Sequence, residues 1–275
     1  MTLITSRNNP KIKLARAMRQ RKTRQESGLF IVEGIRPVGE AVQAGAAIDS
    51  LFYAPELLKS EFALELIQAQ LQAGVACYTT TSEVFEALAD KENPQGLLAL
   101  VRQPECSLEA LNPQNFPWGV ALVAPQDPGN LGTILRTLDA VGASGLLLLE
   151  SSVDIYHPSV VRASMGALFW HPVVAASFDE FAAWSRQHGY HISGTSAHAA
   201  LDYRELPGYT WPRILLLGSE REGLNQEQMQ VCEVMVRLPM RGRSTSLNLG
   251  VAAGVMLYAM LEHEPGALSR GVSLQ

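Results

Sequence analysis

The stretch PQDPGNLGTILRTLDAVG, residues 125–142, joins a turn to a helix and decides the fold class of the second half of the chain. Pro, Gly, Asp and Asn at its start predict the turn. Apolar side chains then recur at helical spacing and define one face: Leu131, Ile134, Leu135, Leu138 and Val141. Two apolar runs flank the stretch, GVALVA at 119–124 and GLLLLE at 145–150. Two buried strands joined through a helix predict a parallel β-α-β unit.

Arg136 lies on the side of this helix opposite the apolar face. One interpretation is an ordinary surface arginine on an amphipathic helix. A second follows from the start of the helix just past the carboxyl end of a strand, where ligands bind in open parallel sheets. Arg136 would then overhang the ligand crevice, with Asp127 or Asn130 capping the first turn.

The rest of the second half continues the alternation of apolar runs and helices. Strands are predicted at 171–176, 190–196, 213–218 and 232–239, and helices at 158–169, 178–188 and 246–261. This pattern predicts a mostly parallel sheet covered on both faces. The loops that follow the strands ending near 124, 218 and 239 are therefore the places to look for a ligand site.

The first half also alternates, which predicts a separate, smaller α/β domain. Strands are predicted at 28–34, 48–55, 75–80 and 96–101, and helices at 35–45, 60–74 and 82–90. Residues 103–118 hold three prolines without periodicity and are interpreted as a linker. The predicted organisation is a basic arm at 1–25, a domain at 26–102, the linker at 103–118 and a second domain at 119–275.

The first 25 residues hold eight Lys and Arg and no acidic residue, whereas the whole chain has a formal net charge of −5. A basic arm on an acidic body is typical of RNA contact, and a solvated basic helix explains the charge alone equally well. A weak apolar stripe predicts that the arm is helical when docked: Ile12, Leu14, Ala15 and Met18.

Composition argues against several classes of protein. With 47% hydrophobic and 18% charged residues, the chain has the composition of a soluble globular protein. It has no apolar run that approaches the roughly 18 residues of a membrane span, and its start lacks the apolar core of a signal peptide, so we expect it in the cytoplasm and no membrane partner. The three cysteines lack metal-ligand spacing, so we expect neither a disulfide framework nor a metal site.

Two further segments carry unusual loops. LLLGSEREGL, residues 215–224, ends a buried strand in a polar bend, where Gly218 and Gly223 permit a close ligand or simply form the turn. LPMRGRSTSLNLGVAAGVMLYAM, residues 238–260, places Ser246 in a good N-cap position before a nearly all-apolar helix. Gly250 and Gly254 in that helix allow close packing, and a helix apolar all round needs partners on every side, a second subunit among them.

These segments together resemble the SpoU (TrmH) family of RNA ribose 2′-O-methyltransferases, within the SPOUT superfamily. The family pattern N-x-G-x-x-x-R matches Asn130 to Arg136, and G-[NS]-E-x-x-G matches Gly218 to Gly223. The pattern P-M-x-G-x-x-x-S-L-N matches Pro239 to Asn248, and VDIYHPSVVRASMGALFWHPV is similar to the family's middle segment. ITSRNNPKIK, GLFIVEG and NPQGLLALV are similar to the substrate-binding domain of rRNA-modifying members. Three motifs in order are specific, whereas one alone would be weak.

The resemblance implies a small N-terminal α/β RNA-binding domain, a C-terminal parallel-sheet domain with a deep trefoil knot, and a homodimer. S-adenosylmethionine is the implied cofactor, held by residues of the second and third motifs: Leu217, Gly218, Leu238, Met240, Ser246 and Leu247. The implied catalytic set is Arg136, Asn130, Glu220, Ser246 and Asn248. A guanidinium stays protonated, so Arg136 is interpreted as a group that positions the target phosphate and ribose, with phosphate-coupled proton transfer as the alternative. RNA contacts are expected at Arg7, Lys11, Lys13, Arg16, Arg36, Arg162 and Arg243.

The predicted function is therefore AdoMet-dependent methylation of a ribose 2′-hydroxyl, in 23S rRNA because of the separate N-terminal domain. One alternative is methylation of tRNA. Another is a non-catalytic RNA-binding or ribosome-assembly protein that keeps the scaffold. The lack of G-x-G-x-x-G after any predicted strand argues against a dinucleotide-binding enzyme.

Overall fold

The computed structural model describes residues 3–90 and 93–263, which fold into two compact units. Unit 1 runs to Glu105 and also includes Asp154–Trp170, and unit 2 comprises Cys106–Val153 and the described residues from His171 onward. The segment Asp154–Trp170 was expected within the second domain, but its contacts place it in unit 1. Among the described residues, no helix is both long and apolar enough to cross a membrane.

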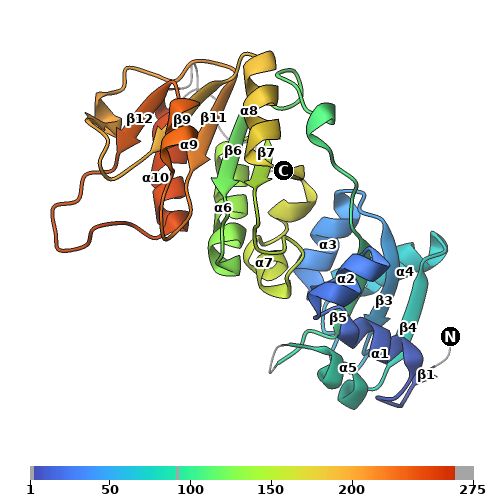
Figure 1. Ribbon diagram of the computed structural model, residues 1–275. Coiled ribbons are helices and arrows are strands. Elements are labelled where there is room, and N and C mark those ends of the chain that lie inside the picture. The colour runs from blue at the N-terminus through green and yellow to red at the C-terminus, as the bar shows by residue number, and fades with distance from the viewer. Residues whose placement is uncertain (1–2, 91–92, 264–275) are drawn as a thin grey trace. The chain divides into compact units, whose positions relative to one another are not determined.

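Unit 1 is built on a five-stranded mixed sheet in the order β1-β4-β3-β5-β2 (Figure 1). Its strands are β1 (Leu3–Ile4), β2 (Leu29–Glu33), β3 (Ile48–Tyr53), β4 (Ala76–Thr80) and β5 (Leu97–Arg102). Its helices are α1 (Pro10–Ala17), α2 (Arg21–Ser27), α3 (Ile35–Gln43), α4 (Glu61–Gln72), α5 (Ser82–Leu88) and α7 (Pro158–Ala163), with a 3-10 turn at Ala167–Phe169. The strand β5 pairs antiparallel with both β2 and β3.

The basic N-terminal segment is part of the core of unit 1 and not a separate arm. Ile12, Ala15 and Met18 are fully buried in one apolar cluster with Phe52 and Phe85. Leu14, the fourth member of the predicted stripe, is 44% exposed. The prediction of helix is confirmed, but the helices are held by core packing, so a deletion of residues 1–25 would remove core side chains as well as charge.

Unit 2 is built on a seven-stranded, all-parallel sheet in the order β10-β12-β9-β11-β6-β7-β8, which confirms the predicted fold class. Its strands are β6 (Trp118–Val123), β7 (Gly145–Leu149), β8 (Val173–Ala176), β9 (His191–Thr195), β10 (Leu201–Asp202), β11 (Arg213–Leu217) and β12 (Val234–Arg237). Its helices are α6 (Pro128–Val141), α8 (Phe178–Gln187), α9 (Gln226–Gln230) and α10 (Leu249–Glu262), with 3-10 turns at Leu108–Ala110 and Tyr203–Glu205.

Helices cover both faces of this sheet, which explains why its central strands β6 and β7 are buried and apolar along their whole length. All six residues of β6 are buried. Ala121 of β6 and Leu147 of β7 point to one face, where they cluster with Phe181 and Trp184 of α8. The helices α6 and α10 lie side by side in Figure 1 and contact each other along their length. Sheets buried on both faces are typical of parallel connections.

The predicted linker belongs to unit 2 from Cys106 onward. Leu108, Leu111 and Phe116 join the same core cluster as α8. Trp184 donates its indole N–H to the carbonyl of Leu111 at 3.0 Å, and Tyr190 donates its hydroxyl to the carbonyl of Phe116 at 2.7 Å. Aromatic side chains therefore fix a segment that lacks periodicity of its own.

The ends of α6 and α10 follow local capping chemistry, with one difference from the expectation. Asp127 caps α6 by accepting the backbone N–H of Asn130 at 2.7 Å, which leaves the Asn130 side chain free for other contacts. Asn248, and not Ser246, caps α10 by accepting the N–H of Gly250 at 2.9 Å. The helix consequently begins three residues later than predicted, at Leu249.

Candidate active site

A pocket of about 450 Å³ lies in unit 2 beyond the carboxyl ends of β9, β11 and β12. This is the edge of the sheet where ligands bind in parallel α/β folds. The six residues assigned to cofactor binding all line it: Leu217, Gly218, Leu238, Met240, Ser246 and Leu247. The pocket thus brings together the second and third motifs, which are separated by the strand β12 in the sequence.

The loop after β11 is closed so tightly that Gly218 has no room for a side chain. A Cβ atom there would lie 2.1 Å from the carbonyl carbon of Gly223 and 2.3 Å from the backbone nitrogen of Leu224. Gly223 has a φ of 69° and donates its N–H to the carbonyl of Ser219 at 3.0 Å. Both glycines are therefore required by the turn, which is one of the two roles left open by the sequence.

A chain of side-chain hydrogen bonds connects one residue from each motif. Asn130 donates its amide Nδ2 to Glu220 Oε1 at 3.2 Å, and its Oδ1 accepts from Asn248 Nδ2 at 2.8 Å. Asn130 is 9% exposed, so these contacts are partly sheltered from water. Because one partner accepts and the other donates, the two contacts fix the orientation of the Asn130 amide.

Glu220 also holds the turn that precedes α6. Its carboxylate accepts the backbone N–H of Gln126 at 3.2 Å and that of Asp127 at 3.3 Å. With the contact from Asn130, the exposed Glu220 carboxylate accepts hydrogen bonds from three N–H groups. It thereby links the loop after β11 to the loop after β6. The loop after β6 was predicted to belong to the site, and it reaches the pocket through Glu220.

Arg136 lies apart from these contacts. It is on the exposed face of α6 and makes no hydrogen bond or ion pair with any residue that the structure describes. It does not line the pocket, whereas Glu220 and Ser246 do. Within one chain, the structure brings together Asn130, Glu220 and Asn248 and leaves the guanidinium of Arg136 in solvent.

The loop after β9 is a part of the site that the sequence motifs missed. Thr195, Ser196 and His198 line the pocket. Arg237 at the end of β12 donates from Nη1 to the carbonyl of Ala199 at 2.9 Å and to the carbonyl of Ala200. The available signal was the position of this loop, which also follows a parallel strand.

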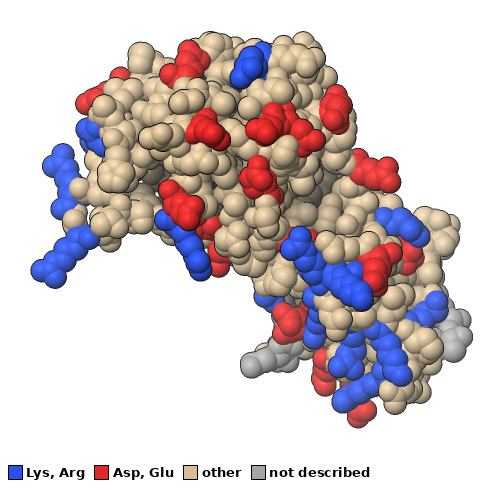
Figure 2. Space-filling view, viewed as in Figure 1, with Lys and Arg blue, Asp and Glu red and all other residues tan. Residues whose placement is uncertain are grey.

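The residues assigned to RNA contact are distributed over both units. Arg7, Lys11, Lys13 and Arg16 are exposed at the start of unit 1, and Figure 2 shows Lys and Arg gathered over α1 and α2. Arg36 on α3 and Arg162 on α7 are exposed in the same unit, and Arg243 is exposed in the loop before α10 of unit 2. Across residues 3–90 and 93–263, no group of three or more His, Cys, Asp or Glu side chains could hold a metal ion.

Comparison with known proteins identifies the family. Residues 117–258 match the SpoU rRNA Methylase family, and residues 9–99 match the MRM3-like substrate binding domain. The chain is 33% identical over 262 residues to a 23S rRNA (uridine(2479)-2′-O)-methyltransferase of Streptomyces viridochromogenes, covering 93% of this chain and 90% of that protein. It is 29% identical over 259 residues to a 23S rRNA (guanosine(2553)-2′-O)-methyltransferase of Bacillus subtilis, covering 94% and 98%.

A solved structure shows the same likeness. The AdoMet-bound rRNA methyltransferase of Sinorhizobium meliloti superposes with a TM-score of 0.87 at 35% identity, covering 95% of this chain and 98% of that one. Because 95% of this chain is covered, the likeness extends over both units. This chain belongs to the SpoU rRNA methylase family.

Proposed function

We propose that this chain transfers a methyl group from S-adenosylmethionine to a ribose 2′-hydroxyl of 23S rRNA. The observation that carries the proposal is the pocket at the carboxyl edge of the parallel sheet, lined by two motif loops and hydrogen-bonded through Glu220 to Asn130. The two rRNA methyltransferases described above support the reaction and the substrate class. They modify different nucleosides, so family membership supports the class of RNA and not a particular position.

The pocket fits the proposed cofactor in size and chemistry. Its volume of about 450 Å³ is within the range of pockets that bind drug-sized ligands. Leu217, Leu238 and Leu247 offer apolar contact to an adenine ring, and the backbone of the loop after β11 offers polar groups. When bound, AdoMet supplies an activated methyl group on a sulfonium, so the protein needs to hold and orient the acceptor.

Asn130 is proposed to fix the geometry of the site. An amide has two N–H donors and two acceptor lone pairs, and Glu220 and Asn248 each use one of them. One donor and one lone pair are then left for the ribose or for Arg136. Asn130 would hold the loops of the second and third motifs in register while it orients the substrate.

Arg136 is proposed to bind the phosphate next to the target ribose. Its guanidinium carries a planar set of N–H donors that suits a phosphate, and it stabilises negative charge that develops on the 2′-oxygen. The proton of the 2′-hydroxyl passes either to water or, through the bound phosphate, to a neutral Arg136, and only the second route makes Arg136 the base. Arg136 is exposed and has no partner among residues 3–90 and 93–263, so its N–H donors are available for such a contact.

A homodimer is part of the proposal. Helix α10 leaves Val251 and Tyr258 each 51% exposed, and Leu247 just before it is 40% exposed. These apolar side chains are suited to burial against a second copy of the chain. The family resemblance predicts this dimer and also the trefoil knot in the C-terminal part of unit 2. Sedimentation or light scattering of the wild type and of Tyr258→Glu tests the dimer.

The experiment that tests the function is transfer of labelled methyl from AdoMet to unmodified 23S rRNA, with the wild type and Arg136→Ala side by side. Labelling by the wild type alone, at one mapped ribose, supports the proposal. Labelling of tRNA instead would favour the tRNA alternative. Binding of rRNA and AdoMet without any transfer would favour a ribosome-assembly protein. We place the activity in the cytoplasm, where rRNA is modified.

A further inference from the structure

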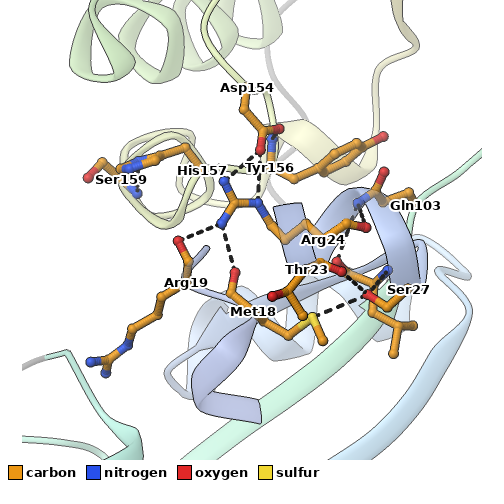
Figure 3. Close-up of polar contacts among 11 residues, drawn as sticks. Met18, Arg19, Thr23, Arg24, Ser27, Gln103, Asp154, Tyr156, His157 and Ser159 are labelled. Carbon is orange, nitrogen blue, oxygen red and sulfur yellow. Dashed lines mark hydrogen bonds and ion pairs between the residues drawn. The ribbon is translucent and has the colours of Figure 1, made fainter. Parts of the chain in front are cut away.

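One of the eight cations in the basic N-terminal segment is not a surface charge. Arg24 of α2 is 1% exposed, and Figure 3 shows its guanidinium enclosed by four hydrogen bonds. Its Nε and Nη2 donate to Asp154 Oδ2 at 2.9 and 2.6 Å. Its Nη1 donates to the carbonyls of Met18 and Arg19 at 2.7 and 2.8 Å. A buried guanidinium is tolerated only with such partners, so Arg24 and Asp154 depend on each other.

Asp154 begins the segment Asp154–Trp170, which connects β7 to β8 of unit 2 in the sequence but packs in unit 1. Its Oδ1 accepts the backbone N–H of Tyr156 at 2.9 Å, and the Tyr156 ring lies 4.6 Å from that of Phe30 in β2. At the other end, Trp170 donates its indole N–H to Glu40 Oε2 of α3 at 3.0 Å. Unit 1 thus holds the segment at both ends.

The helix α7 lies between these two anchors and carries Arg162. Val160 and Val161 are buried where α7 contacts β2, which leaves Arg162 on the outer side with 48% of its side chain exposed. Arg162 donates from Nη1 to Asp90 Oδ2 at 3.1 Å, and Arg19 donates from Nη2 to the carbonyl of Leu88 at 2.6 Å. The guanidinium groups of Arg162 and Arg19 therefore bind Asp90 and Leu88, which are two residues apart in the chain.

Arg19 and Arg162 also line the same small hollow of unit 1, together with the carboxylates of Glu33 and Asp90. Asp90 occupies one Nη1 contact of Arg162, and a guanidinium has five N–H donors, so the others remain for an outside partner. Arg16 is exposed in the last turn of α1, and Arg19 follows three residues later, in the turn after that helix.

We propose that unit 1 presents a composite RNA-binding surface, formed by Arg16 and Arg19 of the N-terminal segment and Arg162 of α7. In this proposal the Arg24–Asp154 ion pair is the positioning element that keeps α7, and therefore Arg162, beside Arg19. The inference rests on the proposed function for its partner. Two carboxylates lie beside Arg19 and Arg162, so the proposal rests on guanidinium N–H donors, which suit a phosphate, and not on net charge. It assigns phosphate contact to a segment that the sequence places among the methyltransferase motifs.

The test measures the affinity of the full-length protein for an unmodified 23S rRNA transcript between about 50 and 200 mM salt. Arg162→Gln is expected to weaken binding roughly threefold to tenfold and to reduce the salt slope by about 0.7–0.9, the value of one phosphate contact. Arg186→Gln, at an exposed position on α8 of unit 2, is the matched control and should leave the affinity unchanged.

The ion pair is tested with Asp154→Asn, which keeps the shape and one acceptor. In that background Arg162→Gln should have no further effect, whereas Arg16→Gln should retain its full effect. The same pattern is expected with Arg24→Lys as the second background.

An unchanged affinity for Arg162→Gln, in a protein whose wild type binds RNA, would overturn the composite surface. An equal effect of Arg162→Gln in both backgrounds would overturn the positioning role, as would loss of the Arg16→Gln effect, because the pair would then support all of unit 1. A wild type that binds AdoMet but no RNA would instead refute the proposed function.

Discussion

Replacement of Asn130 by aspartate tests the hydrogen-bond chain that joins the three motifs. Asn130→Asp keeps the side-chain shape and the acceptor for Asn248, but it replaces the donor toward Glu220 by a carboxylate oxygen. Two unit charges at the observed 3.2 Å repel by about 1.3 kcal/mol at the dielectric constant of water and by about 5 kcal/mol at an effective value of 20.

The exposure of Glu220 narrows this range of repulsion energies. Glu220 is exposed, so the interaction is closer to the lower bound. The lost hydrogen bond adds roughly 1 kcal/mol. The first turn of α6 favours an anion and offsets about 0.5 kcal/mol. We therefore expect Asn130→Asp to lower the free energy of unfolding of unit 2 by about 1–3 kcal/mol at pH 8.

The loss of stability caused by Asn130→Asp should increase as pH rises. Repulsion raises the pKa of the introduced carboxyl in the folded protein above its ordinary value of about 3.9. At pH values between the pKa of this carboxyl in the unfolded state and its higher pKa in the folded state, the folded state binds more protons. The stability of the variant therefore falls as pH rises through that interval. Thermal melts of wild type and variant at pH 5 and pH 8 measure this, and the deficit should be smaller at pH 5.

Asn225→Asp is the matched control. Asn225 caps α9 by accepting the N–H of Gln228 at 2.9 Å, a contact that a carboxylate makes equally well. Its stability should change by less than about 0.5 kcal/mol and should not fall with rising pH. An Asn130→Asp deficit that is equal at pH 5 and pH 8 would refute the contact with Glu220.

Three further predictions concern single residues. Arg136→Ala should abolish methyl transfer while AdoMet affinity and melting temperature stay at wild-type values, because the side chain has no partner among the described residues; retained turnover in the labelling assay would remove it from the mechanism. Gly218→Ala should weaken AdoMet binding more than about tenfold by calorimetry, because the new Cβ would lie 2.1 Å from the backbone of the opposing loop. Gly242→Ala, at a position with open space around it, should bind AdoMet normally. Equal affinities of the two variants would contradict the tight loop. Burial raises the pKa of the Cys232 thiol to about 12, so iodoacetamide at pH 8 should label exposed Cys106 first, and mass spectrometry showing faster labelling of Cys232 would argue against that burial.

Local pattern was sufficient for most of the fold and for much of the candidate pocket. The helix α6 was predictable because its apolar residues recur at helical spacing and Asp127 has strong capping chemistry. The parallel sheet was predictable because its central strands β6 and β7 are apolar along their whole length and its strands alternate with helices. The elements that were missed, β1, β10 and α9, span only two to five residues, which is too short for a period to show.

The start of α10 shows where local chemistry leaves a choice. Ser246 and Asn248 are both good capping residues, so the sequence alone could not select between them. In the fold, the Asn248 amide caps the helix through its oxygen and binds Asn130 through its nitrogen. A contact between residues far apart in the chain decides which residue ends the loop.

Charge shows the same division between sequence and fold. The sequence by itself determined the alternation of elements, the family motifs and the concentration of cations in the first 25 residues, because each depends on residue type and spacing. Only the tertiary structure decided that Arg24 is buried against Asp154, that α7 belongs to unit 1 and that Arg136 stands apart from the pocket. Burial and pairing depend on which segments meet in space, and a count of residues carries no information about that.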